Sequence, residues 1–246
     1  DDYLRKKPKY QIDYYLTFNR YYSSILSQKI KSKFAHIGFI ENNTYKIKKK
    51  FNKKKILYIS EFDLNIFKNK FNNKKLKNYF RPERKLLPIV HDFCKINNYQ
   101  LFIFPRTSSD LEKSFYFNIL KGKKFIYLNR NEHKSYNEID SSMLVISMHS
   151  TLGYESLARG KKTAIFCGRT FFDKSRSFGW PKYNFNSKGF FWLNKIDEKK
   201  ILKILENLSL MKNNVWLKKS KKYLNDICLY DYKNRKMRDI ILKHFI

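Results

Sequence analysis

The chain has 246 residues, 42% of them hydrophobic and 17% aromatic, and its formal net charge is +32. This composition supplies enough apolar surface for a folded core, which excludes a disordered or fibrous chain. No apolar run in the sequence is long enough to cross a bilayer as a helix.

The first part of the chain has the pattern of a β-α-β unit. Residues 11–18 predict a strand, residues 19–32 a helix with an apolar stripe, and residues 34–40 a second strand, after which Asn42-Asn43 predicts a turn. The unit is too small to be a Rossmann-like domain by itself, so we expect residues 1–45 to be the end of an N-terminal domain of that type. A Lys-rich connector follows, and we expect residues 46–246 to form the C-terminal domain.

The second domain opens with a new strand-helix-strand pattern. Residues 56–60 and 100–104 predict strands, and residues 82–97 predict the helix between them. Arg106 comes just after the second strand, and parallel sheets bind ligands beyond the carboxyl ends of their strands. Its guanidinium is a candidate partner for phosphates, and a surface Arg without a specific contact is the alternative.

Two segments that begin with Ser have the capping-box spacing and predict helix starts in the next part of the chain. Ser109-Asp110-Leu111-Glu112 matches a capping box and predicts a helix to about residue 120. Residues 125–128 predict a strand. The same spacing recurs over residues 135–138 and predicts a short helix.

The stretch from residue 140 to 169 is the most informative in the chain. Residues 143–146 predict a buried strand, residues 152–159 a short helix ended by Gly160, and residues 163–167 another strand. Strand, polar turn, helix and strand form the β-α-β unit of a parallel sheet. The sequence therefore predicts an α/β fold: a Rossmann-like parallel sheet with helices on both faces.

The turn and first helical turn of this unit hold the candidate binding residues. Ser150 or Thr151 can cap the helix, whose free N–H groups can bind an anion. Gly153 lets a ligand or another backbone approach closely. Glu155 lies four residues after Thr151, which is not capping-box spacing if Thr151 is the cap, and its carboxylate could bind the two hydroxyls of a ribose. An ordinary corner with a solvated Glu155 is the alternative.

The loop over residues 168–189 is the second candidate region, because it combines Gly, aromatic and charged residues. Arg169 follows its strand directly and could pair with a phosphate or a sugar carboxylate. Trp180 could stack on a sugar or a base, or pack beneath the loop. A short strand over residues 190–193 and a helix capped by Asp197 come next, and two more helices close the chain.

The stretch STLGYESLARGKK, followed by an apolar strand and then FGWP, resembles a family of bacterial surface-carbohydrate biosynthesis proteins. The segments DYYLTFN and GFIENN near the start extend the resemblance over most of the chain. The family is similar to two-domain GT-B glycosyltransferases. The resemblance implies that Ser150 and Thr151 bind donor phosphates, that Glu155 binds the ribose, and that a C-terminal helix returns to the first domain. Ser150-Thr151 replaces the usual Gly-Gly turn of many GT-B enzymes.

On this basis we expect a glycosyltransferase that moves a sugar from a nucleotide-sugar to a surface polysaccharide or lipid-linked glycan. His149 is a weak candidate for a catalytic base, and a satisfied turn histidine is the alternative. No DxD or other metal-ligand pattern is present, so we expect no cofactor and no metal. A sugar-nucleotide epimerase or a glycerol-phosphate-type transferase on the same fold is the alternative reaction.

The high positive charge supports two other hypotheses about partners. A basic nucleic-acid-binding protein would bind its target with a steep salt dependence. We discount nucleic acid because the basic residues are mostly Lys, are spread along the chain, and occur with other residues that have AT-rich codons. We expect a cytoplasmic protein, from its three scattered cysteines, with a peripheral contact to the inner membrane through its basic surface as the further alternative.

Overall fold

The computed structural model describes residues 10–48, 52–69, 76, 78–132, 134–173, 176–179 and 185–245. The chain divides into two compact units, one formed by residues 1–47 and 217–246 and the other by residues 48–216. The sequence-based division placed the boundary at residue 45 and assigned the C-terminal helices to the second domain. In the structure, the helices after residue 217 belong instead to the same unit as the first segment of the chain.

The first unit contains a two-stranded parallel sheet and short helices. Its elements are β1 (Tyr10–Thr17), α1 (Arg20–Leu26), β2 (Ile30–His36), α2 (Ile40–Thr44), the second part of α10 (Asn213–Ile227), a 3-10 helix (Tyr232–Asn234) and α11 (Arg235–His244). The helix expected over residues 19–32 is shorter, and β2 begins four residues before the expected strand. Asn19 caps α1 by accepting a hydrogen bond from the backbone of Tyr22 at 2.7 Å.

Asn43 attaches the C-terminal segment to this unit. Its side-chain amide donates to the Ile37 carbonyl at 2.7 Å and to the Asn234 side chain at 2.9 Å. Its carbonyl oxygen accepts the backbone N–H of Asp231 at 2.8 Å. We expected Asn42 and Asn43 to form a turn, but both are fully buried in α2.

The second unit begins with β3 and contains the larger sheet. Its elements are β3 (Asn52–Ile59), α3 (Leu64–Asn69), α5 (Arg81–Ile96), β4 (Gln100–Phe104), α6 (Asp110–Ile119), β5 (Ile126–Tyr127), α7 (Ser135–Ser141), β6 (Ser142–Ser147), α8 (Thr151–Ala158), β7 (Thr163–Phe166), β8 (Trp192–Leu193), α9 (Glu198–Leu210) and the start of α10.

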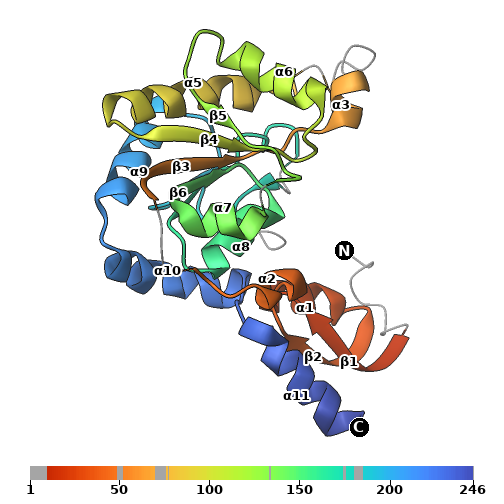
Figure 1. Cartoon of the computed structure of the whole chain (residues 1–246). Helices are drawn as coiled ribbons and strands as arrows, with labels where there is room; N and C mark the ends of the chain where they lie inside the picture. Colours follow the sequence, from red (N-terminus) through yellow and green to blue (C-terminus); the bar gives the residue numbers. More distant parts are fainter. Residues whose placement is uncertain are drawn as a thin grey trace. The chain divides into compact units, whose positions relative to one another are not determined.

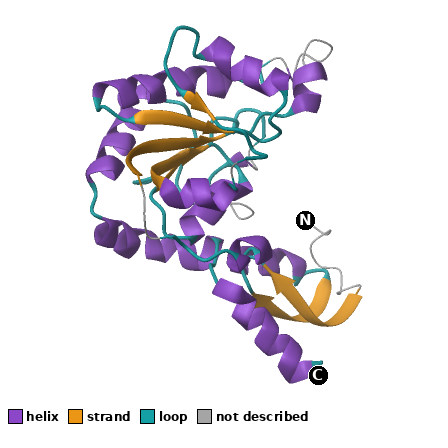
Figure 2. Ribbon diagram, in the orientation of Figure 1, coloured by secondary structure: helices purple, strands orange, loops and turns teal. Residues whose placement is uncertain are grey.

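The six strands of this sheet are all parallel, in the order β5-β4-β3-β6-β7-β8. Helices α5 and α6 cover one face, and α7 and α8 cover the other (Figures 1 and 2). The predicted α/β fold class is therefore confirmed. The strand order changes direction between β3 and β6, and ligands of such sheets bind outside the carboxyl ends of the strands at that point.

Alternating side chains of β3 pack into the two helix layers. Leu57 and Ile59 lie in a buried cluster with Tyr136 and Ile139 of α7. Tyr58 points to the other face, where its ring contacts Tyr116 of α6. Both faces of the central strand are thus buried, as the continuous apolar run of this strand indicates. The three cysteines are buried free thiols, and none of the described helices has the length and apolar character needed to cross a bilayer.

Candidate functional site

The corner between β6 and α8 has the predicted strand-turn-helix form and lies at the topological switch point. Ser150 is the N-cap of α8, and its hydroxyl oxygen accepts the backbone N–H of Leu152 at 3.3 Å. At the other end, Gly160 has a φ of +75°, and its N–H donates to the Leu157 carbonyl at 2.8 Å. The predicted glycine stop is therefore confirmed, because this left-handed conformation favours Gly.

Most backbone N–H groups at this corner already have partners within the protein. The N–H of His149 donates to the Glu61 carboxylate, and that of Ser150 donates to the Ser147 hydroxyl at 3.2 Å. Thr151 differs, since its N–H has no hydrogen-bond partner among the described residues and its side chain is exposed. The corner therefore offers an anion the Thr151 amide and hydroxyl and the positive end of the α8 dipole.

Gly153 has a packing role in the structure. A Cβ atom at this position would lie 2.5 Å from the hydroxyl oxygen and 2.6 Å from the Cβ of Ser147. Such distances are well inside van der Waals contact, so any larger residue would push α8 away from β6. The structure thus shows a packing role for Gly153, and its role in the approach of a ligand stays a prediction.

Glu155 lies one turn after Thr151 and is 9% exposed. Its carboxylate accepts a hydrogen bond from the Tyr136 hydroxyl at 2.9 Å. The carboxylate is therefore held by α7 and is not solvated, which differs from the alternative of a solvated surface Glu155. A ligand hydroxyl at this position would share the carboxylate with Tyr136.

Arg169 is buried in a cluster of charges at the carboxyl end of β7. Its guanidinium pairs with Glu61 at 2.7 Å and with the fully buried Glu83, and it lies 4.3 Å from the centre of the Tyr79 ring. We predicted that Arg169 would face a ligand phosphate or carboxylate. The structure instead places it against two internal carboxylates, and its exposed fraction is only 2%.

Arg106 lies in the loop after β4. Glu112 fixes this loop by accepting the backbone N–H groups of Arg106 and Thr107, both at 2.8 Å, and of Ser108 at 3.1 Å. The predicted cap at Ser109 is confirmed, because its hydroxyl accepts the N–H of Glu112 at 3.2 Å. The Glu112 carboxylate, however, binds the residues before the cap and not the cap itself as in a capping box.

The guanidinium of Arg106 is half exposed and lies 3.3 Å from the carboxylate of Asp63. Strand β3 separates β4 from β6 in the sheet. Arg106 and the Thr151 corner therefore share the carboxyl edge of the sheet but do not lie on adjacent strands. An exposed ion pair such as Arg106–Asp63 contributes little to stability and leaves the guanidinium accessible to a ligand.

His149 occupies the turn between β6 and α8. Its Nε2 lies 3.3 Å from the Ser177 carbonyl, and its ring meets Tyr154 edge-on at 5.9 Å. Because a carbonyl only accepts, Nε2 carries the proton in the neutral ring and Nδ1 carries the lone pair. Burial lowers the pKa of His149, and the Glu61 carboxylate offsets part of that effect.

This lowered pKa predicts a pH dependence of stability. The folded protein binds the His149 proton less readily than the unfolded chain, whose histidine pKa is about 6.5. The stabilisation from neutral His149 is thus present above pH 6.5 and is lost as the pH falls through the lower folded-state pKa. Urea unfolding at several pH values should show a shallower loss in His149→Asn than in the wild type. The exposed His244→Asn should keep the wild-type slope, and equal slopes in all three proteins would contradict the prediction.

Several residues of the site have no distinctive pattern in the sequence. Glu61 and Glu83 bind Arg169, and the Tyr154 hydroxyl accepts the backbone N–H of Gly179 at 3.2 Å. The one sequence signal is the position of Glu61, which follows the first strand of the domain at its carboxyl end. Trp180, a candidate from the predicted binding loop, lies outside the described residues.

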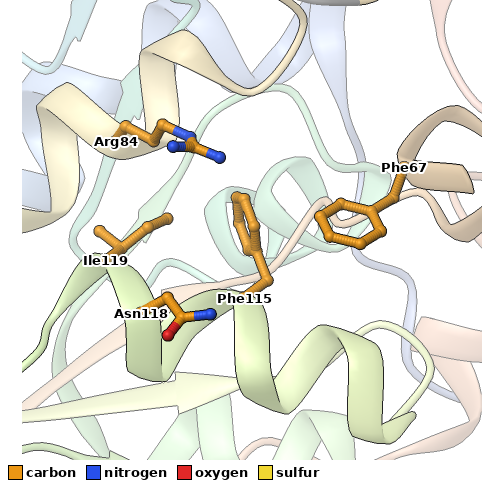
Figure 3. Close-up of a pocket in the computed structure, with 5 residues that line it drawn as sticks. All are labelled: Phe67, Arg84, Phe115, Asn118 and Ile119. Atoms are coloured by element: carbon orange, nitrogen blue, oxygen red, sulfur yellow. The ribbon is translucent and has the colours of Figure 1, made fainter. Parts of the chain in front are cut away.

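Two pockets stand out in the described part of the second unit. The first, of about 320 Å³, lies among α3, α5 and α6, and Figure 3 shows Phe67, Arg84 and Phe115 around it with Asn118 and Ile119. The second, of about 330 Å³, lies at the start of α5 beside the loops that follow β7 and β8. Ser150, Thr151 and Glu155 line neither pocket. Within the same described residues, no group of three or more His, Cys, Asp or Glu side chains is arranged to hold a metal ion.

Residues 2–245 match a protein family described as "putative O-antigen biosynthesis protein". No curated protein has a significant match to the sequence. Among solved structures, the wall teichoic acid polymerase TagF is similar over 94% of this chain and 58% of its own, with a TM-score of 0.54 and 15% identity. A variant of the same polymerase soaked with CDPG is similar over 94% of this chain and 56% of its own, with a TM-score of 0.50 and 14% identity.

A Listeria monocytogenes protein described as "putative UDP-N-acetylglucosamine 2-epimerase" is also similar. The likeness covers 86% of this chain and 54% of that one, with a TM-score of 0.52 and 12% identity. At these identities the likeness shows the fold alone: the chain shares the parallel α/β sheet fold of these structures. The chain spans somewhat more than half the length of each of these structures.

Proposed function

The chain belongs to this O-antigen biosynthesis family, and we propose that it is a glycosyltransferase of GT-B type that uses a nucleotide-sugar donor. The acceptor in this proposal is a growing surface polysaccharide or a lipid-linked glycan. The acceptor hydroxyl gives its proton to a base as its oxygen attacks the anomeric carbon, the bond from that carbon to the donor phosphate oxygen breaks, and the nucleotide leaves with the negative charge.

One observation carries this proposal: the Thr151 amide, which has no hydrogen-bond partner among the described residues, lies at the start of α8 and at the switch point of a parallel sheet. A helix start at this position is suited to bind a diphosphate and to stabilise the charge on the leaving nucleotide. The Thr151 hydroxyl would add a second hydrogen bond. Because the N–H groups of His149 and Ser150 are bound internally, Thr151 is the residue expected to contact the phosphate directly.

Each of the other predicted residues has a separate role in the proposal. Glu155 would accept the ribose hydroxyls while it keeps the hydrogen bond from Tyr136. Arg106 would add positive charge at the same edge of the sheet, and Arg169 would hold the framework beneath it. His149 remains a candidate base because its neutral ring has a lone pair on Nδ1. In this scheme the helix dipole and the cations neutralise the phosphate, and no metal takes part.

A thermal-shift panel of UDP-, CMP-, GDP- and CDP-linked sugars and glycerol tests the proposal. A ligand at one hundred times its Kd stabilises the folded state by about 2.7 kcal/mol, which raises Tm by several degrees in a chain of this size. We expect one base class to give this shift. Glu155→Ala should lose most of it, and Thr151→Ala, which removes the hydroxyl but keeps the backbone amide, should lose part of it.

Two control variants make the test specific. Thr44→Ala removes an exposed threonine from the other unit and should leave the shift intact. Tyr136→Phe removes the same internal hydrogen bond as Glu155→Ala but keeps the carboxylate, so it should retain binding. The proposal fails if no nucleotide stabilises the protein, or if Tyr136→Phe and Glu155→Ala lose the shift equally.

The same panel separates the alternative reactions on this fold. An epimerase would convert a nucleotide-sugar without any acceptor, and product analysis by NMR would detect the epimer. A glycerol-phosphate-type transferase would respond to CDP-glycerol in preference to any nucleotide-sugar. Either outcome would retain the donor site and replace the transferred group.

A further inference from the structure

The pocket at the start of α5 has three cations that the proposed donor site does not use. Arg81 and Lys85 come from α5, and Lys195 comes from the loop after β8. All three side chains are exposed, and none has an acidic partner in the described parts of the chain. We call this pocket, which Phe171 also lines, the basic pocket.

Close packing fixes the floor of the basic pocket. A Cβ atom on Gly168 would lie 2.6 Å from Pro82 and 2.8 Å from Ile196. The start of α5 and the loop after β8 are therefore packed directly against the backbone that follows β7. The Thr170 hydroxyl also donates to the Asn194 carbonyl at 2.6 Å, which ties the two loops together.

The nearby carboxylates do not neutralise the three cations. Glu83, on the same turn of α5, is fully buried and pairs with Arg169. Asp197, which follows Lys195 in the chain, pairs with Lys200 at 2.6 Å. The basic pocket thus keeps an excess of positive charge around a volume of about 330 Å³, which is sufficient for a monosaccharide unit.

Phe171 adds an apolar surface beside this charge. Its side chain is 59% exposed. A sugar ring has an apolar face of C–H groups that can pack on such a ring, while an acid group on the sugar binds the cations. Neutral sugars would use only the first of these two contacts.

We propose that the basic pocket binds an acidic sugar residue of the glycan acceptor, with its carboxylate or phosphate group held by Arg81, Lys85 and Lys195. This inference rests on the proposed function, since it names the acceptor class of the same reaction. The pocket lies at the carboxyl edge of the sheet beside β7 and β8, and the Thr151 corner follows the adjacent strand β6. An acceptor held there would approach the edge at which the donor is proposed to bind.

Ligand-observed NMR titrations with glucuronic acid, glucose 1-phosphate and glucose test this proposal. We expect at least one of the acidic sugars to bind, with an affinity that falls as salt is added, and we expect glucose to bind much more weakly. The comparison of glucuronic acid with glucose 1-phosphate distinguishes a carboxylate from a phosphate. Equal binding of glucose and both acidic sugars would overturn the proposal.

Variants locate the binding. The double variant Arg81→Glu with Lys195→Glu should weaken binding of the acidic sugar by at least about tenfold, because two charge-assisted hydrogen bonds are replaced by repulsion. Phe171→Ala should weaken binding of the sugar but not of inorganic phosphate. Lys113→Glu combined with Lys121→Glu, two exposed lysines on and just after α6, is the control matched for the change of charge. If the double variant binds as well as this control, the basic pocket is not the site.

The nucleotide thermal shift separates this proposal from the proposed function. The double variant should retain the nucleotide shift, because none of its substitutions touches the Thr151 corner. Loss of acidic-sugar binding with the nucleotide shift intact supports both proposals. If the protein binds acidic sugars through Arg81 and Lys195 but binds no nucleotide, the basic-pocket proposal stands and the transferase proposal is refuted. If it binds a nucleotide but no acidic sugar, only the basic-pocket proposal is refuted.

Discussion

Arg169→Met should lower the free energy of unfolding by about 3–5 kcal/mol, the usual cost of removing one partner from a buried ion pair. The guanidinium lies between Glu61 and Glu83 and is 2% exposed, so its removal leaves two carboxylates buried without a cation. Met fills much of the same volume, so loss of charge and not a cavity dominates the effect. Urea unfolding of the second unit, followed by Trp fluorescence, would measure it.

The controls for Arg169→Met come from the same cluster and the same edge of the sheet. Arg106→Ala removes an exposed Arg and should change stability by less than about 1 kcal/mol. Combining Arg169→Met with Glu61→Gln and Glu83→Gln removes the unpaired charges and should recover part of the loss. A loss in Arg169→Met no larger than that in Arg106→Ala would show that the cluster does not stabilise the fold.

This cluster also explains why sequence reasoning did not find the partners of Arg169. The expectation that Arg169 binds a ligand rests on its position after a strand, and the structure confirms that position. Its partners Glu61 and Glu83 are 108 and 86 residues away in the chain. Local pattern cannot show that two distant carboxylates converge on one guanidinium, because only the order of strands in the sheet brings them together.

The elements of the fold could be predicted from the sequence more fully than the partners of Arg169. The apolar strand over residues 143–146, the Gly160 stop and the Asp197 cap each depend on local physical chemistry, and all three occur as expected. The errors lie where a polar residue is buried by distant contacts. Asn43 is an example: it was expected in a turn, but it is buried in α2 because it binds Asp231 and Asn234.

Gly153 and Glu155 show the same limit at the candidate site. The spacing of Thr151 and Glu155 correctly placed both residues on α8. It could not show that Gly153 is required by the Ser147 side chain, or that the Tyr136 hydroxyl binds the Glu155 carboxylate. Whether Glu155 binds a ribose stays a prediction that the Tyr136→Phe comparison tests.

Asp140→Asn should also destabilise the protein, by about 3–5 kcal/mol, because a buried guanidinium loses its carboxylate partner. Asp140 is 1% exposed and binds Arg159 through two hydrogen bonds of 2.9 and 2.6 Å. Its carboxylate also accepts the backbone N–H of Lys48 at 2.8 Å. These contacts join the end of α7, the end of α8 and the segment before β3.

The Asp140–Arg159 pair and the proposed phosphate site lie at opposite ends of α8, so a change at one should affect stability and a change at the other should affect binding. Arg159 lies at the C-terminal end of α8, and the proposed phosphate site lies at its N-terminal end. Asp140→Asn should therefore lower the urea midpoint while the folded fraction still binds the nucleotide with the wild-type Kd. Thr151→Ala should do the opposite, because Thr151 is exposed and its side chain contributes little to packing. If Asp140→Asn weakens nucleotide binding at a temperature at which the protein is fully folded, the two ends of α8 are coupled, and the assignment of Asp140 to stability alone is wrong.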